Sequence, residues 1–332
     1  MGNLFKYANK ELSTDAFLAW LFEELGSNPD LAPHCREIFV KLGFISNEEA
    51  PENIRVALQK DKVDLILYFE INGIEHSILF ENKTWSTIHS NQLERYKSLY
   101  PNCRKYIYFK IGYIDRWEHS NLGEYTPISA ELFYSAILPL SPLSQIVQHY
   151  CEFLKSECID PINKTLSLLS NSVPSAFKSA VAQRHLIGEI YEQLKETDPH
   201  LKFKKGVNKD GTPWTQLDIC KREGYYDGSN ETIFWRIDSR SKRTYIRLCQ
   251  YSSIDSDRDD LVSTKKQRLH ALRDTVNVVC HDYNLKRGKV TNKGTKESEI
   301  IIFFFDENPY SMIKEELPDL TKKIQARYYT LQ

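Results

Sequence analysis

A two-residue turn between two apolar runs constrains this chain more than any other feature of its sequence. The turn is Asn72-Gly73, a pair favoured where a β-hairpin needs two successive residues with positive φ. The flanking runs, Val63–Phe69 and Ile74–Phe80, are apolar and rich in aliphatic and aromatic residues, so we expect two antiparallel strands. Because their central residues are apolar on both alternating faces, we expect the hairpin to be buried on both sides.

The turn also fixes which residues of the two strands lie side by side. Ile71 opposes Ile74 in a two-residue hairpin, and counting outward from that pair places Asp64 opposite Glu81. Opposed side chains have Cβ atoms about 5 Å apart, and Lys83 shares the strand face of Glu81. Two buried carboxylates need a proton or a cation. Mg²⁺ or Mn²⁺ held by oxygen ligands would satisfy them. The alternatives are a slipped register or a bulge, which would separate the carboxylates, and an ion pair of Lys83 with one of them.

The segments around the hairpin predict an α/β unit. Amphipathic helices are expected over Glu11–Gly26 and Pro33–Leu42, followed by a strand at Ile54–Leu58. After the hairpin come a helix at His89–Tyr100 and an apolar strand at Tyr106–Ile111. This order of helix, three strands, helix and strand is typical of a compact α/β domain.

The length of 332 residues suits two domains of ordinary size. Serines, asparagines and Pro174 between Ser167 and Ser175 are typical of a linker, so we expect one domain over residues 1–166 and a second over 167–332. A run of predicted strands from Leu201 onward, followed by a long helix, makes the second domain α+β.

The net charge of −1 hides an asymmetry between these halves. Residues 1–166 carry 16 Lys and Arg against 22 Asp and Glu, whereas residues 201–296 carry 21 against 12. A basic second domain suits contact with nucleic acid, although an ordinary solvated surface would give the same count. The basic residues that we expect to make this contact include Lys204, Arg236, Arg247, Lys265, Lys266, Arg268, Lys286, Arg287 and Lys289.

Composition excludes several classes of protein. The mean hydropathy is −0.49, and no apolar run approaches the ~20 residues of a membrane helix. Seven cysteines without a CxxC pair exclude a zinc ribbon and disfavour a disulfide framework. We therefore expect a soluble, cytoplasmic protein with no membrane partner.

The residues at the predicted end of the hairpin form a known motif. Val63 and Asp64, followed by Glu81, Asn82 and Lys83, resemble the PD-(D/E)xK nuclease superfamily, with Val63 in place of the proline. The resemblance implies a restriction-endonuclease-like core, a mixed central sheet flanked by helices. The order of elements predicted above is similar to that core.

Two helices extend the resemblance to a bacterial branch of the superfamily. Glu11, followed by a Phe-Leu-Ala-Trp-Leu run at residues 17–21, is similar to the N-terminal helix of that branch. Gln92 and Tyr96 reproduce the Q-x-x-x-Y feature of the helix after the lysine, which RecB-like nucleases also have. Thr14-Asp15 departs from the branch, which has a His-Ser-like pair there.

The resemblance implies a metal centre. Asp64 and Glu81 would be the main ligands of Mg²⁺ or Mn²⁺, and the Asn82 carbonyl would complete the shell. Glu11 would be a further ligand, either directly or through water. The resemblance covers about residues 11–137, and the second half of the chain resembles nothing that we can name.

The resemblance also implies catalytic roles. Lys83 would orient or deprotonate the attacking water, and Gln92 and Tyr96 would contact the scissile phosphate or brace Lys83. The alternative is that Gln92 and Tyr96 have no catalytic role and only pack their helix against the sheet.

We therefore expect a metal-dependent nuclease that hydrolyses phosphodiester bonds, in DNA rather than RNA. The resemblance suggests a role in host defence or restriction, with a homodimer or a defence-system partner as further options. The alternatives are an RNA nuclease and a non-catalytic nucleic-acid-binding or assembly protein on a nuclease-derived fold.

Overall fold

The structure is a computed structural model that describes residues 3–7, 10–88, 91–198, 201–240, 243–254, 257–290 and 296–331, without the side chains of Lys10, Glu11 and Arg240. The chain divides into two compact units. Unit 1 comprises residues 1–114 and 118–163, and unit 2 comprises residues 115–117 and 164–332. The main division lies close to the one after residue 166 that the sequence predicts.

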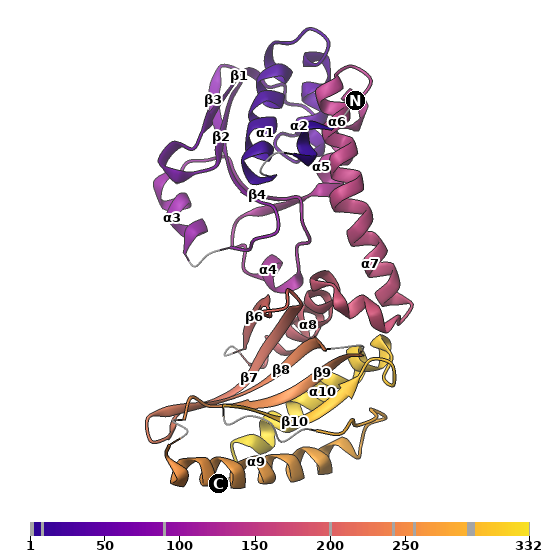
Figure 1. Ribbon diagram of the computed structural model, residues 1–332. Helices are drawn as coiled ribbons and strands as arrows, with labels where there is room; N and C mark the ends of the chain where they lie inside the picture. The colour runs from indigo at the N-terminus through magenta and orange to yellow at the C-terminus, as the bar shows by residue number, and fades with distance from the viewer. Residues whose placement is uncertain are drawn as a thin grey trace. The chain divides into compact units, whose positions relative to one another are not determined.

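Unit 1 is an α/β structure with a mixed five-stranded sheet and helices on both faces (Figure 1). Its strands are β1 (Glu52–Leu58), β2 (Leu65–Ile71), β3 (Ile74–Lys83), β4 (Lys105–Lys110) and β5 (Thr126–Ser129). Its helices are α1 (Lys10–Ser27), α2 (Cys35–Lys41), α3 (Gln92–Leu99), α5 (Ala130–Ile137) and α6 (Gln145–Phe153). Two more helices, α4 (Arg116–Ser120) and α7 (Asp160–Ser170), contain residues of both units.

The sheet of unit 1 has the strand order β1-β2-β3-β4-β5. Strands β1, β2 and β3 are antiparallel, and β3, β4 and β5 are parallel. Asn72 and Gly73 have φ values of 52° and 76°, as the tight turn between β2 and β3 requires. The ladder from Ile71–Ile74 to Leu65–Phe80 has the predicted register, so that prediction is confirmed over the whole ladder.

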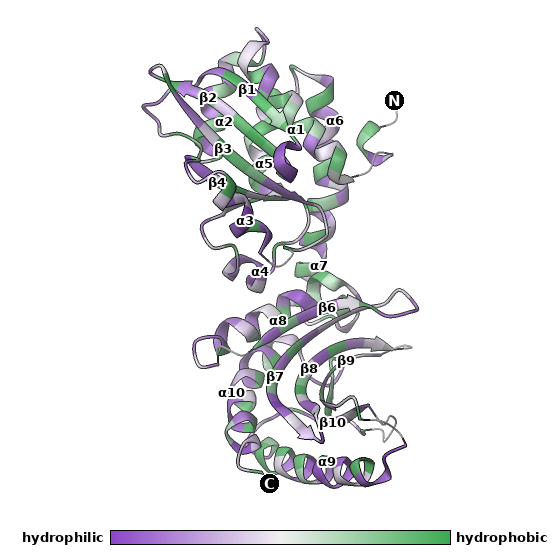
Figure 2. Ribbon diagram, turned by 90° about the vertical axis from the view of Figure 1, so that its left-hand side faces the viewer, coloured by the Kyte–Doolittle hydropathy of each residue, from purple (hydrophilic) through white to green (hydrophobic). Residues whose placement is uncertain are grey.

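Both faces of this sheet are covered by apolar side chains. Leu65, Leu67 and Phe80 belong to the core that α1, α2, α5 and α6 form with one face. Ile66 and Leu79, from the same two strands, belong to a second core that α3 covers on the opposite face. The burial of the hairpin on both sides is therefore confirmed, and Figure 2 shows these central strands as largely hydrophobic.

Some predicted segments were wrong or incomplete. Helix α7 runs through Ser170, so the first four residues of the stretch that we expected to be a linker are helical, and Leu169 among them is buried. The short elements α4 and β5 were missed, because five and four residues carry too little periodicity to be recognised.

Unit 2 is built on an antiparallel sheet of order β10-β9-β8-β7-β6. Helices α8, α9 and α10 pack on one face of this sheet, where Trp235 is buried and donates from its indole N–H to the Thr321 hydroxyl at 2.9 Å. The elements are α8 (Ala180–Leu194), β6 (Lys202–Val207), β7 (Pro213–Tyr226), β8 (Ser229–Arg240), β9 (Arg243–Tyr251), α9 (Asp259–Cys280), β10 (Glu297–Phe304) and α10 (Tyr310–Tyr328). Within the described ranges, no helix combines the length and apolar character needed to cross a membrane.

One lysine of α9 is buried inside unit 2. Lys265 is 4% exposed, and its ammonium donates to the Lys296 carbonyl at 2.6 Å. Burial lowers the pKa of Lys265 from its ordinary 10.5 to about 8, although Glu231 and Glu297 partly oppose this. Its charged form is therefore a cost to the folded state at neutral pH.

This burial predicts a pH-dependent stability. Because the folded chain binds the Lys265 proton more weakly than the unfolded chain, the free energy of unfolding should rise as the pH increases above 8. Between pH 7.5 and 10 the free energy of unfolding of the wild type, measured in denaturant, should rise by about 2 kcal/mol relative to that of Lys265→Met. The matched variant Lys266→Met, at an exposed position, should follow the wild type at every pH. A constant difference between wild type and Lys265→Met would contradict the prediction.

Candidate metal-dependent active site

The predicted Asp64 lies one residue before β2, where the β2–β3 ladder ends. Its Oδ2 accepts the backbone N–H of Asn82 at 2.7 Å, and its own carbonyl accepts the N–H of Gln59 at 3.1 Å. Asp64 therefore reaches across to the last residues of β3. The Asp64 side chain is half-buried, and the Asn82 N–H holds its carboxylate in place.

Glu81 and Lys83 lie at the end of β3 and form a buried ion pair. Glu81 is 0% exposed, the Lys83 side chain is 9% exposed, and the Lys83 ammonium donates to Glu81 Oε1. Alternation along β3 places both side chains on the face of Leu79. Asp64 lies outside the ladder, which ends at Leu65 and Phe80, so its predicted pairing with Glu81 stays a prediction. The structure thus brings the three predicted motif residues to one end of the hairpin.

Asn82 points its side chain to the opposite face, toward α1. Its Nδ2 donates to Asp15 Oδ1 at 2.6 Å, and Gln59 Nε2 donates to Asp15 Oδ2 at 3.2 Å. Asp15 is 5% exposed and lies inside α1, so it is a buried acceptor that ties the helix to the sheet. We missed this role, because Asp15 reads from the sequence only as a helix-start signal. Glu11, one helical turn earlier, has its side chain outside the described residues.

Gln92 and Tyr96 lie on α3, which covers the sheet face that carries Glu81. The Tyr96 hydroxyl donates to the Lys62 carbonyl at 2.5 Å and accepts from Gln92 Nε2 at 3.1 Å. The Q-x-x-x-Y pair therefore anchors the segment that leads into Asp64. Contact with a phosphate by either residue stays a prediction.

Two buried side-chain oxygens in this region accept no hydrogen bond from the described residues. They are Oδ1 of Asn82 and Oε1 of Gln92. An oxygen left this way in the interior costs free energy unless water, an ion or a ligand supplies a partner. The Asn82 oxygen lies on the α1 face, opposite Glu81, so it is not an acceptor for a cation held beside Glu81.

The donors at this site suit a hard divalent cation. Asp64 and Glu81 provide carboxylate oxygens, and Mg²⁺ is commonly bound by one or two carboxylates, with water and substrate phosphates completing its shell. Among the described side chains, no three of the His, Cys, Asp and Glu type are grouped to hold a metal. Asp64 and Glu81 are donors of the type that Mg²⁺ uses, and the third carboxylate that the resemblance implies, Glu11, falls outside the described side chains.

A buried tyrosine near the site is held in its neutral form. Burial raises the pKa of the Tyr125 hydroxyl, and the negative charge of Glu81 raises it further. Tyr125 donates to the Leu93 carbonyl of α3 at 3.2 Å. It therefore packs the site as a hydrogen-bond donor and is not a candidate base at neutral pH.

Several basic residues that we expected to contact nucleic acid are buried in unit 2. The Arg247 side chain is 4% exposed, and its guanidinium pairs with Asp238 at 2.8 Å and Glu297 at 2.7 Å. Arg268 is 3% exposed, and its Nε lies 3.4 Å from the Glu231 carboxylate. The expectation is therefore wrong for these two and for Lys265, which is also buried. Arg236 is half-buried and pairs with Asp238 at 3.1 Å.

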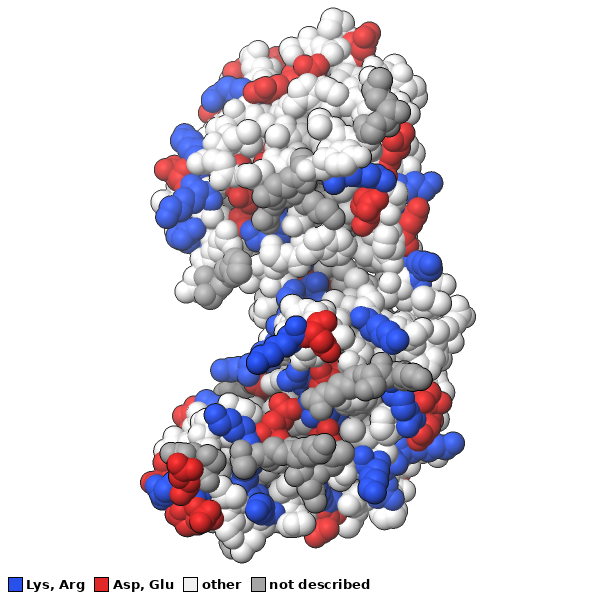
Figure 3. Space-filling view, in the orientation of Figure 1, with Lys and Arg blue, Asp and Glu red and all other residues white. Residues whose placement is uncertain are grey.

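Other residues of the predicted set are exposed, namely Lys266, Lys286, Arg287 and Lys289. On the face of unit 2 that Figure 3 shows, basic side chains are interspersed with acidic ones and do not gather in one patch. A nucleic-acid surface on unit 2 therefore stays a prediction that rests on the exposed residues alone.

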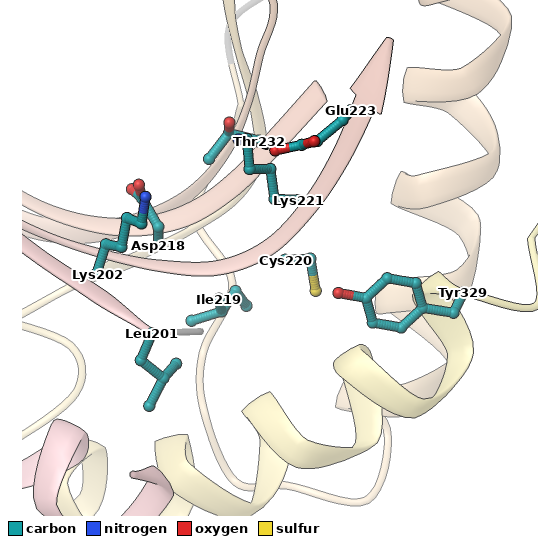
Figure 4. Close-up of a pocket in the computed structure, with 9 residues that line it drawn as sticks. All are labelled: Leu201, Lys202, Asp218, Ile219, Cys220, Lys221, Glu223, Thr232 and Tyr329. Carbon is teal, nitrogen blue, oxygen red and sulfur yellow. Dashed lines mark hydrogen bonds and ion pairs between the residues drawn. The ribbon is translucent and has the colours of Figure 1, made fainter. Parts of the chain in front are cut away.

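Unit 2 contains a cavity of about 370 Å³ beside β7 (Figure 4). Three of its charged side chains are paired, with Lys221 at 2.6 Å from Glu223 and Asp218 at 2.6 Å from Lys204. Burial raises the pKa of the Cys220 thiol, so this cysteine is protonated and unreactive at neutral pH. The cavity is therefore a weaker candidate than the end of the β2–β3 hairpin. Its lining residues are Leu201, Lys202, Asp218, Ile219, Cys220, Lys221, Glu223, Thr232 and Tyr329.

Comparison of the chain with protein-family models, with curated proteins and with solved structures found no match. The resemblance to PD-(D/E)xK nucleases therefore rests on the motif residues and stays a prediction.

The anchoring role of Tyr96 can be measured as stability. Tyr96→Phe removes the donor to the Lys62 carbonyl and the acceptor of the Gln92 amide. We expect the free energy of unfolding to fall by about 1–2 kcal/mol in denaturant titrations. Tyr7→Phe, at a position that is 83% exposed, is the matched control and should leave stability unchanged. Equal stability of the two variants would show that the bond to Lys62 contributes nothing.

Proposed function

We propose that this chain is a metal-dependent nuclease that hydrolyses phosphodiester bonds, with DNA as the substrate. One observation carries the proposal. The Asp64 carboxylate is held 2.7 Å from the Asn82 backbone nitrogen, next to the buried pair of Glu81 and Lys83. This arrangement supplies two carboxylates for a divalent cation and one ammonium for the reacting groups, all at one end of a hairpin.

The architecture of unit 1 supports the proposal. Helix α1, strands β1–β3, helix α3 and strand β4 follow one another around a mixed sheet. We infer that unit 1 has the restriction-endonuclease-like fold, whose core is similar in order and in strand direction. The proposed site lies where that fold would carry it, at the ends of the second and third strands.

Each residue has a task that follows from its contacts. Asp64 and Glu81 would hold Mg²⁺ or Mn²⁺, with the Asn82 carbonyl as a further oxygen and Glu11 as a ligand from α1. The bound cation would polarise a phosphoryl oxygen and lower the pKa of a coordinated water. Lys83 would release its bond to Glu81 on substrate binding and orient the attacking water with its ammonium.

The other contacts keep these groups in place. Asp15 fixes the Asn82 side chain from α1, and Tyr96 fixes Lys62 in the segment before Asp64. Misplacement of reacting groups by about 1 Å can cost a factor of ~100 in rate, so such supports matter to catalysis.

The choice of DNA rests on the resemblance, as does a role in host defence against foreign nucleic acid. The metal acts on a phosphodiester that DNA and RNA share, so the substrate has to be decided by assay. The exposed basic residues of unit 2, such as Lys286 and Lys289, would bind the phosphate backbone.

Variants of Lys83 test the proposal. Purified protein is incubated with plasmid, linear DNA, single-stranded DNA and RNA in Mg²⁺, in Mn²⁺ and in EDTA. We expect metal-dependent cleavage that Lys83→Met lowers at least about 100-fold, because the ammonium beside the reacting phosphate is lost. Substrate binding without metal should be retained.

Lys60→Met provides the matched control, because Lys60 is exposed and lies in the segment before Asp64. Its cleavage rate should equal that of the wild type. Circular dichroism of each variant separates loss of activity from loss of fold. If the wild type cleaves none of the four substrates in either metal, the nuclease proposal is wrong and a non-catalytic binding role replaces it.

A further inference from the structure

A second buried ion pair lies on the sheet face that carries Glu81 and Lys83. The parallel register of β3 and β4 places Tyr108 beside Glu81 and Lys110 beside Lys83. Lys110 and Glu118 are both 0% exposed, and the Lys110 ammonium donates to the two carboxylate oxygens of Glu118 at 2.6 and 2.7 Å. The Tyr108 hydroxyl also donates to the Glu118 carboxylate.

This pair is close enough to act on the proposed metal site. Neighbouring strands lie about 4.8 Å apart, so the Lys110 and Lys83 side chains start from adjacent positions on the same face. Charges interact more strongly in the interior than in water. An ammonium on Lys110 without its carboxylate would therefore oppose a divalent cation at Asp64 and Glu81.

The formal charges at this end of the sheet show what Glu118 contributes. Asp64, Glu81 and Glu118 carry three negative charges, and Lys83 and Lys110 carry two positive ones, which leaves a net charge of −1 for these five groups. Without the Glu118 charge the net value is zero. A buried ion pair is a weak source of stability, so stability alone does not account for one at this position.

We infer that Glu118 is a positioning residue that holds and neutralises Lys110, and that it thereby sets the affinity of the site for a divalent cation. The inference rests on the proposed function, because it assumes that Asp64 and Glu81 bind metal. It assigns no contact between Glu118 and the metal or the substrate. It predicts that the affinity for a divalent cation falls when the Lys110–Glu118 pair becomes more positive and returns when the pair is neutral again.

Calorimetric titration with Mn²⁺ at pH 8, on the full chain without nucleic acid, tests this directly. We expect Glu118→Gln to raise the dissociation constant at least tenfold, because the Lys110 charge is no longer neutralised. The double variant K110Q/E118Q restores the net charge and should bind Mn²⁺ within about threefold of the wild type. Glu118→Gln binding as tightly as the wild type would overturn the inference alone.

A control variant at the other end of β4 distinguishes an effect of charge on Mn²⁺ binding from an effect of a damaged fold. Glu49 accepts from Arg104 Nη2 at 2.6 and 2.8 Å, and Glu49→Gln breaks that pair without changing the charge at the site. It should leave the affinity for Mn²⁺ unchanged. An equal loss of affinity in Glu49→Gln and Glu118→Gln would overturn the inference, because both would then act through the fold.

Removal of one partner from a buried pair can prevent folding. If Glu118→Gln does not fold, Lys110→Gln and K110Q/E118Q decide the matter, because they differ only by the charge of Glu118. The inference requires Lys110→Gln to bind Mn²⁺ at least fivefold more tightly, and equal affinities would overturn it. Absence of Mn²⁺ binding by the wild type would overturn the proposed function and the inference together.

Discussion

Burial of the Glu81 carboxylate is the constraint on which the site of unit 1 depends. Glu81 is 0% exposed at the end of β3, where an isolated negative charge would be too costly to keep. Lys83, two residues along β3, pairs with the Glu81 carboxylate, and Asp64 adds a second carboxylate from the position just before β2. The end of the sheet therefore carries two carboxylates and one ammonium, and a divalent cation would balance the remaining negative charge.

Three neighbouring elements hold this end of the hairpin. Helix α1 does so through Asp15 and the Asn82 amide, and α3 through Tyr96 and the Lys62 carbonyl. Strand β4 brings the Lys110–Glu118 pair beside Lys83. Each of these contacts joins a polar group of the hairpin, or of the strand beside it, to one partner inside the unit. The charged residues are therefore held by hydrogen bonds and ion pairs, and no disulfide links the described cysteines.

The hairpin was predictable because its turn is local. Two residues with positive φ fix the register, and the register fixes which side chains share a face. The role of Asp15 was not predictable, because a buried acceptor inside a helix has no local signal and depends on how the helix packs. The Lys110–Glu118 pair escaped for a similar reason, since parallel pairing of β3 with β4 is not fixed by any turn. In unit 2 the number of basic residues could be counted from the sequence, but their burial could not. Arg247 and Arg268 pair with carboxylates on other strands and helices, and sequence distance hides such pairs.

The location of the metal is the central claim, and cleavage of the protein backbone by bound iron tests it most directly. Fe²⁺ replaces Mg²⁺ in sites of oxygen ligands, and with ascorbate and peroxide it generates hydroxyl radicals that cut the chain close to the ion. Mass spectrometry of the fragments should place the cuts within a few residues of Asp64 and Asn82, and excess Mg²⁺ should suppress them. Cuts elsewhere in the chain, or cuts at these residues that Mg²⁺ does not suppress, would contradict a metal site at the end of the β2–β3 hairpin.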